Sequence, residues 1–351
     1  MESDVLRRVS SLRRDVTTLP LASHVRHSLV DAGYATLADL VGATPATVAR
    51  QAGITQDEAL EALQHGGSTS TGLRSPVWRS GKTADVIFQQ ERRRRRVVTF
   101  CPALDQLLGG GVAPCEITEF CGVPGIGKTQ LGMQLAVDVQ IPKEFGGLGG
   151  QAVYIDTEGS FMAERVEEIA HACLEHLQKI ATSAQDADLL RLMGKWDVEK
   201  MLANIHFFRV HDSTEQIALV HVLPEFLRLH PEVRLVVLDS VAFHFRQEFR
   251  DMAKRTRLLA AMMQALMNVA NDRHVAVVLT NQVTTKIHGQ GDARLVPALG
   301  DSFAHASTNR VLLFWHECKR HAHLYKSPYL PGRTVAYALT SQGVRGVDAS
   351  S

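Results

Sequence analysis

Residues 118–130 read Thr-Glu-Phe-Cys-Gly-Val-Pro-Gly-Ile-Gly-Lys-Thr-Gln, and this stretch decides the fold. Residues 122–129 within it fit the pattern G-x-x-x-x-G-K-[ST] of a phosphate-binding loop. The glycines allow a tight turn whose backbone N–H groups point inward and form a nest for anionic oxygens. In such a loop Lys128 would reach the β- and γ-phosphates of a nucleotide, and the Thr129 hydroxyl would hold Mg²⁺.

The residues on either side of the loop agree with this motif. An apolar run at 116–121 is typical of a strand that enters the loop, and 131–141 is typical of a helix whose N-terminal dipole would face the phosphates. The alternative is a glycine-rich turn that binds no nucleotide. The dinucleotide pattern G-x-G-x-x-G does not fit, because Gln130 stands at its third glycine. The predicted nucleotide-binding residues of the loop are Gly122, Val123, Pro124, Gly125, Ile126, Gly127, Lys128, Thr129 and Gln130.

The composition is that of an ordinary globular protein with room for two domains. The chain has 351 residues, of which 45% are hydrophobic and 21% charged, and a formal net charge of +1. Nucleic-acid binding would therefore need local basic patches, because a net charge of +1 gives no strong overall electrostatic attraction to nucleic acid. The five cysteines form no C-x-x-C pair, and we see no signal peptide or membrane-length apolar run. We expect reduced thiols in an intracellular protein.

Residues 1–65 have the pattern of a small all-helical domain. Apolar residues recur at helical spacing over 21–32, and Thr44 and Pro45 fit the N-cap and first position of a further helix. A glycine-centred turn at 52–55 joins it to another helix. This arrangement suggests a helix-hairpin-helix whose turn amides contact a phosphate backbone; a helical protein-interaction or spacer domain is the alternative.

Residues 66–96 are predicted to be a linker that ends in a basic run. Gly-Gly-Ser-Thr-Ser-Thr-Gly at 66–72 is flexible by composition, whereas we expect the apolar run 86–88 to dock on a partner. Residues 92–96 are five consecutive arginines. They could contact phosphates, serve as a nuclear import signal, or be a solvated run before a strand.

Residues 97–351 alternate between strand-like and helical patterns. The alternation predicts an α/β core with a mostly parallel, twisted sheet flanked by helices and an antiparallel extension formed by the late strands. The expected helices are 130–141, 162–181, 215–229 and 251–272. The expected strands are 97–100, 116–121, 152–156, 205–210, 234–239, 275–280, 311–315, 324–326 and 334–339.

Polar residues follow three of the expected strands, where the strand ends of a parallel sheet converge. Asp239 ends an apolar strand, as in a Walker B element that holds Mg²⁺ through water. Asp156 and Glu158 end another strand, and one of the two carboxylates would polarise the attacking water. Gln282 ends a third and suits a sensor of the γ-phosphate. The alternative for Glu158 and Gln282 is simple loop capping.

Several motifs together resemble one known family. They are Asp-Thr-Glu-Gly at 156–159, Leu-Asp-Ser at 238–240, Thr-Asn-Gln-Val at 280–283 and Ala-His-Ala-Ser-Thr at 304–308. The chain resembles the eukaryotic RecA-type recombinases over nearly its whole length. The stretches 134–142, 155–162, 295–300 and 325–328 are similar to those of a recombinase paralogue within that family. The resemblance implies a RecA-type P-loop ATPase core preceded by a small helical domain.

The resemblance assigns roles to matching residues. Lys128, Glu158 and Gln282 would be catalytic, with Glu158 activating water, while Thr129 and Asp239 would hold the metal. Arg165 would stack on adenine. His305 would couple the nucleotide state to DNA, or would be a hydrogen-bonded structural histidine. The DNA-binding loops would fall near 244–256 and 284–303, with the alternative of a solvated helix face for the first. The candidate DNA-binding residues are Arg246, Arg250, Lys254, Arg255, Lys286 and Arg294.

Residues 325–331 resemble a cap that one protomer lays over the ATP of its neighbour. Pro331 would cover the adenine. Lys326 replaces the aspartate of the filament-forming recombinases, and we predict that it points at the neighbour's γ-phosphate; an unpaired exposed lysine is the alternative. Lys82 stands where those recombinases carry the phenylalanine of their polymerisation motif, so we do not expect long homopolymeric filaments.

These features predict a DNA-dependent ATPase subunit of a recombinase-paralogue complex, located in the nucleus and also in the cytoplasm. It would use ATP and Mg²⁺, hydrolyse ATP weakly, and bind single-stranded or branched DNA. Its partners would be other recombinase paralogues, with ATP at the subunit interfaces, and the strand-exchange recombinase, but no membrane. It would promote recombinase filament assembly in homologous-recombination repair of double-strand breaks. The alternatives are a scaffold that uses ATP as interfacial glue and a self-sufficient strand-exchange recombinase.

Overall fold

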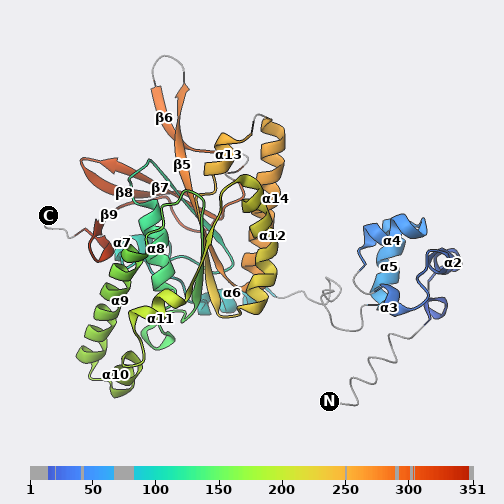
Figure 1. Cartoon of the computed structure of the whole chain (residues 1–351), viewed down its shortest axis with the longest axis horizontal. Coiled ribbons are helices and arrows are strands. Elements are labelled where there is room, and N and C mark those ends of the chain that lie inside the picture. The colour runs from blue at the N-terminus through green and yellow to red at the C-terminus, as the bar shows by residue number, and fades with distance from the viewer. Residues whose placement is uncertain are drawn as a thin grey trace. The chain divides into compact units, whose positions relative to one another are not determined.

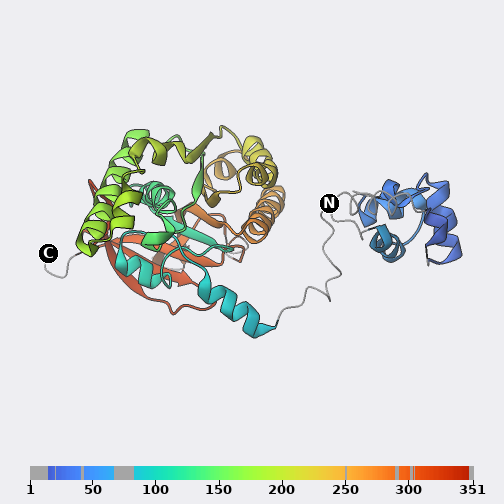
Figure 2. The ribbon, with the colours of Figure 1, turned by 90° about the horizontal axis from the view of Figure 1, so that it is seen from below.

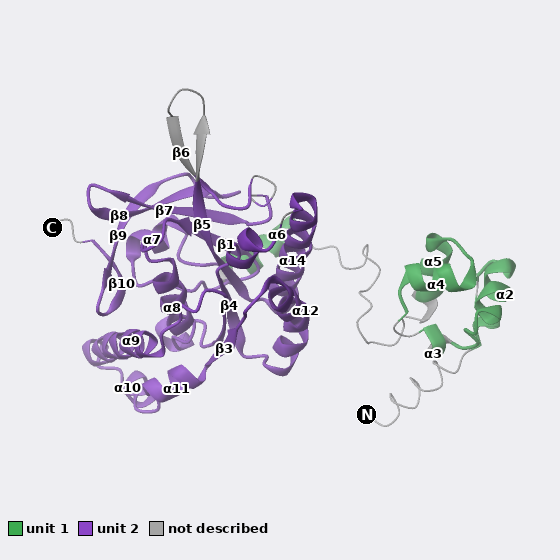
Figure 3. Ribbon diagram, turned by 45° about the horizontal axis from the view of Figure 1, so that its top comes forward, with its two compact units in different colours: residues 1–92 green, residues 93–351 purple. Residues whose placement is uncertain are grey.

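A computed structural model describes residues 15–19, 21–40, 43–66, 83–249, 251–288, 292–300, 303 and 305–347. The chain divides into two compact units, residues 1–92 and 93–351, which are coloured separately in Figure 3. Among the described helices, none is both long and apolar enough to cross a membrane.

The first unit is helical, as predicted. Its apolar centre is formed by buried residues that include Val25, Leu29 and Val48. Thr44 caps the helix that starts at Pro45, because its hydroxyl accepts the Thr47 N–H at 3.2 Å. The elements are η1 (Val16–Thr18), α2 (Ser23–Asp31), α3 (Leu37–Leu40), α4 (Pro45–Ala52), α5 (Gln56–Gly66) and α6 (Ala84–Arg93).

Helix α6 lies within the segment that we predicted as a linker. Its apolar side chains Ile87 and Phe88 are 42% and 53% exposed. Docking of this run on a partner therefore stays a prediction.

The arginine run contributes to the second unit in a way that the sequence did not suggest. One terminal nitrogen of Arg95 donates to the carbonyl of Gly147 at 3.0 Å and to that of Lys143. Arg96 donates to the carbonyl of Leu108 at 2.9 Å. At least these two arginines thus satisfy backbone acceptors of the core, a structural role that differs from all three alternatives above.

The second unit is built on one large sheet, as Figure 1 shows. The strand order is β10-β9-β8-β7-β1-β5-β4-β2-β3. The strands from β7 to β3 run parallel, and β8, β9 and β10 extend the sheet in antiparallel fashion, which confirms the predicted fold class. The strands are β1 (Ile117–Gly122), β2 (Gln151–Asp156), β3 (Ile205–Arg209), β4 (Val233–Asp239), β5 (Ala276–His288), β6 (Asp292–Pro297), β7 (Asn309–His316), β8 (Lys319–Lys326), β9 (Thr334–Thr340) and β10 (Gly343–Gly346).

Two predicted segments differ from the structure. Residues 97–100 form no strand: Val97 pairs only with Val112, and α7 (Pro102–Leu107) begins directly afterwards. The extended backbone ends at Phe100, which has a left-handed conformation (φ 55°). The proline at the first position of α7 then favours the helix. The region 284–303 is not simply a loop, because β5 continues to His288 and pairs antiparallel with β6.

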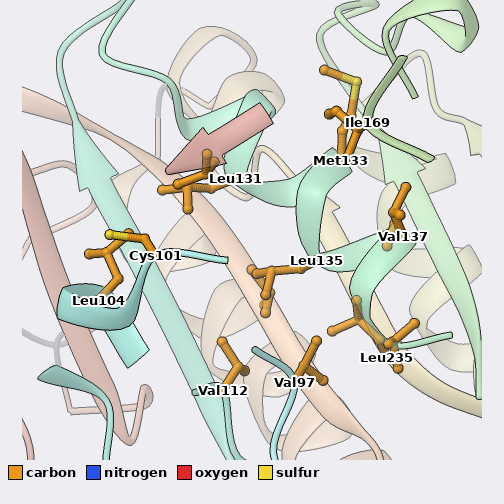
Figure 4. Packing of buried hydrophobic residues seen from close by; sticks show 14 of the residues in the cluster. Val97, Cys101, Leu104, Val112, Leu131, Met133, Leu135, Val137, Ile169 and Leu235 are labelled. Atoms are coloured by element: carbon orange, nitrogen blue, oxygen red, sulfur yellow. The ribbon is translucent and has the colours of Figure 1, made fainter. Parts of the chain in front are cut away.

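Helices cover both faces of the sheet because neighbouring strand residues point to opposite sides. Leu235 and Val237 of β4 belong to the core on the side of α8 and α9, and Val236 and Leu238 belong to the core on the side of α12 and α14. Figures 1 and 2 show these helices around the sheet. Figure 4 shows α8 side chains packed within the first of these cores. The helices, including the four predicted ones, are α8 (Lys128–Asp138), α9 (Ala163–Ala184), α10 (Ala187–Met193), α11 (Val198–Ala203), α12 (Ser213–Leu229), α13 (Phe243–Gln247) and α14 (Met252–Arg273), with the short η3 (Lys143–Phe145).

Asp138 is a buried acid at the end of α8. Its carboxylate accepts from the Gln134 amide at 2.8 Å, while the Gln134 oxygen accepts the Val344 N–H of β10 at 2.9 Å. Burial raises the pKa of Asp138 well above its ordinary value. The folded state therefore keeps the proton after the unfolded chain has lost it, and the free energy of unfolding should fall as the pH rises above about 4.

Asp138→Asn should remove this pH dependence, because the amide mimics the protonated carboxyl. At pH 8 its free energy of unfolding should exceed that of the wild type by at least about 1 kcal/mol, and the gap should close towards pH 4. Urea unfolding at pH 5, 6, 7 and 8 measures the difference. A gap of the same size at each pH would contradict the assignment.

Candidate nucleotide site

The predicted phosphate loop connects β1 to α8, and the surrounding structure requires its glycines. A Cβ at Gly122 would lie 2.8 Å from the carbonyl oxygen of Leu313. Gly127 has φ 110°, a left-handed conformation that starts α8. The Tyr337 hydroxyl of β9 donates to the Ile126 carbonyl at 2.8 Å, so a late strand supports the loop from outside.

Lys128 turns back onto the loop that carries it. Its ammonium group donates to the carbonyls of Gly122 at 2.9 Å and Val123 at 3.0 Å. Burial lowers the pKa of Lys128, and the nearby carboxylates of Glu158 and Asp239 oppose this shift. The lysine thus lies among the groups with which it was predicted to act.

Asp239 ends β4 and is 1% exposed. Its two oxygens accept from the Tyr154 hydroxyl, at 2.8 Å, and from the Thr280 hydroxyl. Burial raises the pKa of Asp239, and hydrogen bonds from Thr280, Thr129 and Tyr154 act in the opposite direction. Sequence reasoning missed Tyr154, although a tyrosine in a buried strand needs a hydrogen-bond partner.

Glu158 is held by two neighbouring strand ends. Its Oε1 accepts from the Ser240 hydroxyl, which follows β4, and from the Gln282 amide of β5 at 3.1 Å. The residues after β2 and β4 thus converge at one edge of the sheet with Gln282, the last β5 residue that pairs with β1. The role of Ser240 was not visible in the sequence.

Asp156 shapes the segment that carries Glu158. Its carboxylate accepts the backbone N–H groups of residues 158–161, with the shortest distance 2.7 Å from Gly159. It also pairs with the Arg209 guanidinium at 3.2 Å. Because these bonds occupy Asp156, the geometry favours Glu158 as the acid that contacts water. Asp156 therefore holds this segment in place, whereas the sequence had suggested it only as an alternative to Glu158. The sequence did not indicate its partner Arg209.

Arg165 on α9 connects the phosphate loop to the last hairpin. Its Nε donates to the Gln130 side chain at 2.8 Å, and its terminal nitrogens donate to the carbonyls of Thr340 at 2.6 Å and Ser341 at 2.7 Å. An ion pair with Glu168 completes the set. Stacking on a base would use the flat face of the guanidinium, whereas these bonds use its edges.

The predicted cap lies at the end of β8 and in the segment after it. The ammonium group of Lys326 donates to the carbonyls of Ser307 at 2.6 Å and His305 at 3.3 Å. Pro331 is exposed. The Tyr329 hydroxyl donates to the Glu116 carboxylate at 2.7 Å and so fixes this segment to the start of β1.

Five of the candidate DNA-binding residues lie in the described part of the chain, on the four elements α13, α14, β5 and β6. Arg246 lies on α13 and donates to the side-chain oxygen of Gln282. Lys254 and Arg255 lie in the first turn of α14. The register pairs Lys286 with Arg294 across β5 and β6. Two predicted residues, Arg250 and Lys82, lie outside the described part of the chain.

A phosphate loop between β1 and α8 lies beside the polar ends of β2 and β4 and beside Gln282 of β5. This arrangement defines a P-loop ATPase core of the RecA type. A family model described as Rad51 matches residues 91–190 and 187–347. The chain belongs to the Rad51 family, which confirms the resemblance inferred from the motifs.

Two curated relatives share the name "DNA repair protein RAD51 homolog 3". The protein of Cricetulus griseus is 45% identical over 347 residues, which cover 97% of this chain and 94% of that protein. The protein of Dictyostelium discoideum is 42% identical over 264 residues, which cover 75% of this chain and 68% of that protein.

Proposed function

We propose that this chain is a DNA-dependent ATPase subunit of a recombinase-paralogue complex that acts in homologous-recombination repair of double-strand breaks. The observation that carries the proposal is the arrangement around Glu158, whose carboxylate meets Ser240 and Gln282 beside Lys128 and Asp239. In an ATPase this set would supply a base, a γ-phosphate sensor, a cation and a metal ligand. The name of the two relatives supports a role in DNA repair.

ATP would bind with its phosphates against the N–H groups of the loop. Lys128 would leave the two loop carbonyls for the β- and γ-phosphates, and Arg165 would stack on the adenine. The hydroxyl of Thr129 and the carboxylate of Asp239 are hard oxygen donors that fit Mg²⁺, which would neutralise phosphate charge. Glu158 would orient the attacking water, and Gln282 would contact the γ-phosphate.

The partners would be other recombinase paralogues, the strand-exchange recombinase and single-stranded or branched DNA. Basic residues on α13, on α14 and in the β5–β6 hairpin support a DNA contact. ATP would lie at subunit interfaces, and the complex would promote recombinase filament assembly. We place the protein in the nucleus and also in the cytoplasm, which microscopy of the tagged full-length chain would check.

Glu158→Gln tests the proposal. The amide keeps the shape of the side chain but cannot act as a base, so Mg·ATP affinity should stay within about twofold while DNA-stimulated turnover falls by about 10²–10⁴-fold. Calorimetry and a phosphate-release assay measure the two quantities. Glu167→Gln, an exposed change of equal charge on α9, is the matched control. Unchanged turnover would overturn the role of Glu158 in orienting water, and absence of turnover in the wild type would overturn the ATPase assignment. Full repair in cells despite lost turnover would favour the scaffold alternative.

Lys326→Ala tests the proposed action in trans. The ammonium group of Lys326 now binds backbone carbonyls of its own chain, and it could exchange them for the phosphate of a neighbour. Turnover of the assembled complex should fall at least about tenfold, because a cation supplied by a neighbour stabilises transition-state charge. ATP binding by the isolated chain should not change. Lys319→Ala, at the other end of β8, is the control. Unchanged turnover and assembly would exclude the role in trans.

A further inference from the structure

A continuous chain of hydrogen bonds links α13 to the carboxylate of Glu158. The Arg246 guanidinium donates to the Gln282 side-chain oxygen. The Gln282 amide nitrogen donates to Oε1 of Glu158 at 3.1 Å, and the Ser240 hydroxyl donates to the same oxygen. Arg246 is exposed, whereas Gln282 and Glu158 are half-buried, so the chain runs from the surface into the site.

The chemistry of arginine fixes the orientation of the Gln282 amide. A guanidinium has donors only, so the carbonyl end of the amide must face Arg246 and the NH₂ end must face Glu158. In this orientation an N–H of the amide is bonded to Glu158. The sensor and the catalytic carboxylate therefore hold each other while Arg246 stays in place.

We propose that Arg246 is a positioning residue that couples DNA binding to ATP turnover. Without DNA, its guanidinium holds the Gln282 amide against Glu158. A DNA phosphate competes for the guanidinium, since a charge-assisted bond to phosphate is stronger than a bond to a neutral amide. Once Arg246 moves to DNA, Gln282 can turn towards the γ-phosphate and Glu158 can take up water. The inference rests on the proposed function and adds a mechanism for its DNA dependence.

Arg246→Ala tests the coupling in the full-length chain. We measure ATP turnover without DNA and with saturating single-stranded oligonucleotide, and oligonucleotide affinity by fluorescence anisotropy. Turnover without DNA should rise at least threefold, and the ratio of stimulated to unstimulated turnover should fall towards one. Arg246→Lys keeps a cationic donor beside the Gln282 oxygen, so it should restore low unstimulated turnover. Arg257→Ala, an exposed change of equal charge on α14, should leave unstimulated turnover at the wild-type value.

The outcomes separate the coupling from simpler roles. If Arg246 only contacts DNA, Arg246→Ala weakens oligonucleotide binding but leaves unstimulated turnover unchanged, which would overturn the inference. Lower unstimulated turnover would also overturn it, because the arginine would then support the active arrangement. A wild-type chain without DNA-stimulated turnover would overturn the proposed function together with the inference. If DNA stimulates turnover of the wild type normally and Arg246→Ala gives either of the first two results, the inference is refuted and the proposed function stands.

Discussion

Replacing Lys128 with alanine should lower the affinity for Mg·ATP and the DNA-stimulated turnover by at least ~100-fold each. Lys128 lies in the phosphate loop, and its ammonium group now occupies a position between the loop carbonyls of Gly122 and Val123. The Lys128 side chain is half-buried, and its attraction to phosphate is stronger there than in bulk water. Titration calorimetry with Mg·ATP and a phosphate-release assay measure both effects.

The controls separate binding from folding. The free energy of unfolding of Lys128→Ala should stay within about 1 kcal/mol of the wild type, because the two released carbonyls can bind water. Lys143→Ala removes an exposed lysine near the far end of α8 and should leave ATP affinity unchanged. An affinity for ATP within threefold of the wild type in Lys128→Ala would contradict the assignment of the phosphate loop.

Replacing Asp156 with alanine should lower the free energy of unfolding by about 3 kcal/mol and turnover by at least about tenfold. The variant leaves four backbone N–H groups without their acceptor and Arg209 without its ion-pair partner. The segment that carries Glu158 then loses its anchor, so the carboxylate is no longer held beside the site. Urea unfolding and the turnover assay measure the two effects.

A second variant shows which bonds matter. The double variant Asp156→Ala/Arg209→Leu also removes the cation that Asp156→Ala leaves unpaired. If its free energy of unfolding returned towards the wild-type value, the loss in Asp156→Ala would be due to the ion pair. We expect little recovery, since the Arg209 side chain is 34% exposed and water can solvate it. A free energy of unfolding of Asp156→Ala within 1 kcal/mol of the wild type would show that the carboxylate does not organise this segment.

The sequence indicated most of the core because its central strands are apolar and its helices are periodic. It was less informative where strands are polar. We expected a strand to end at Thr280, yet β5 continues through polar residues to His288 in a hairpin. Strand β8 begins at Lys319 rather than residue 324, because a strand of an antiparallel sheet can expose one face to water and so tolerates polar side chains. Apolar periodicity cannot detect such segments.

The candidate site shows a similar division. The sequence pointed to the motif residues Lys128, Glu158, Asp239 and Gln282 because each belongs to an identifiable strand or loop pattern. It did not point to their supporting partners, because these depend on register. Strands β2 and β4 pair in a register that places Asp156 opposite Asp239. This register brings the Tyr154 hydroxyl within hydrogen-bonding distance of Asp239. A single sequence does not specify which residues of two strands face each other.

The bracing of the phosphate loop by the last hairpin has a consequence for synthesis of the chain. Tyr337 bonds to Ile126 across 211 positions, and β10 bonds to Gln134 of α8. The loop and its helix emerge early from the ribosome, but these contacts form only after β9 and β10 have been made. The loop of a nascent chain therefore lacks its contacts with β9 and β10 until these strands have been made. The finished site depends on contacts between residues that are far apart in the sequence, and such contacts form slowly.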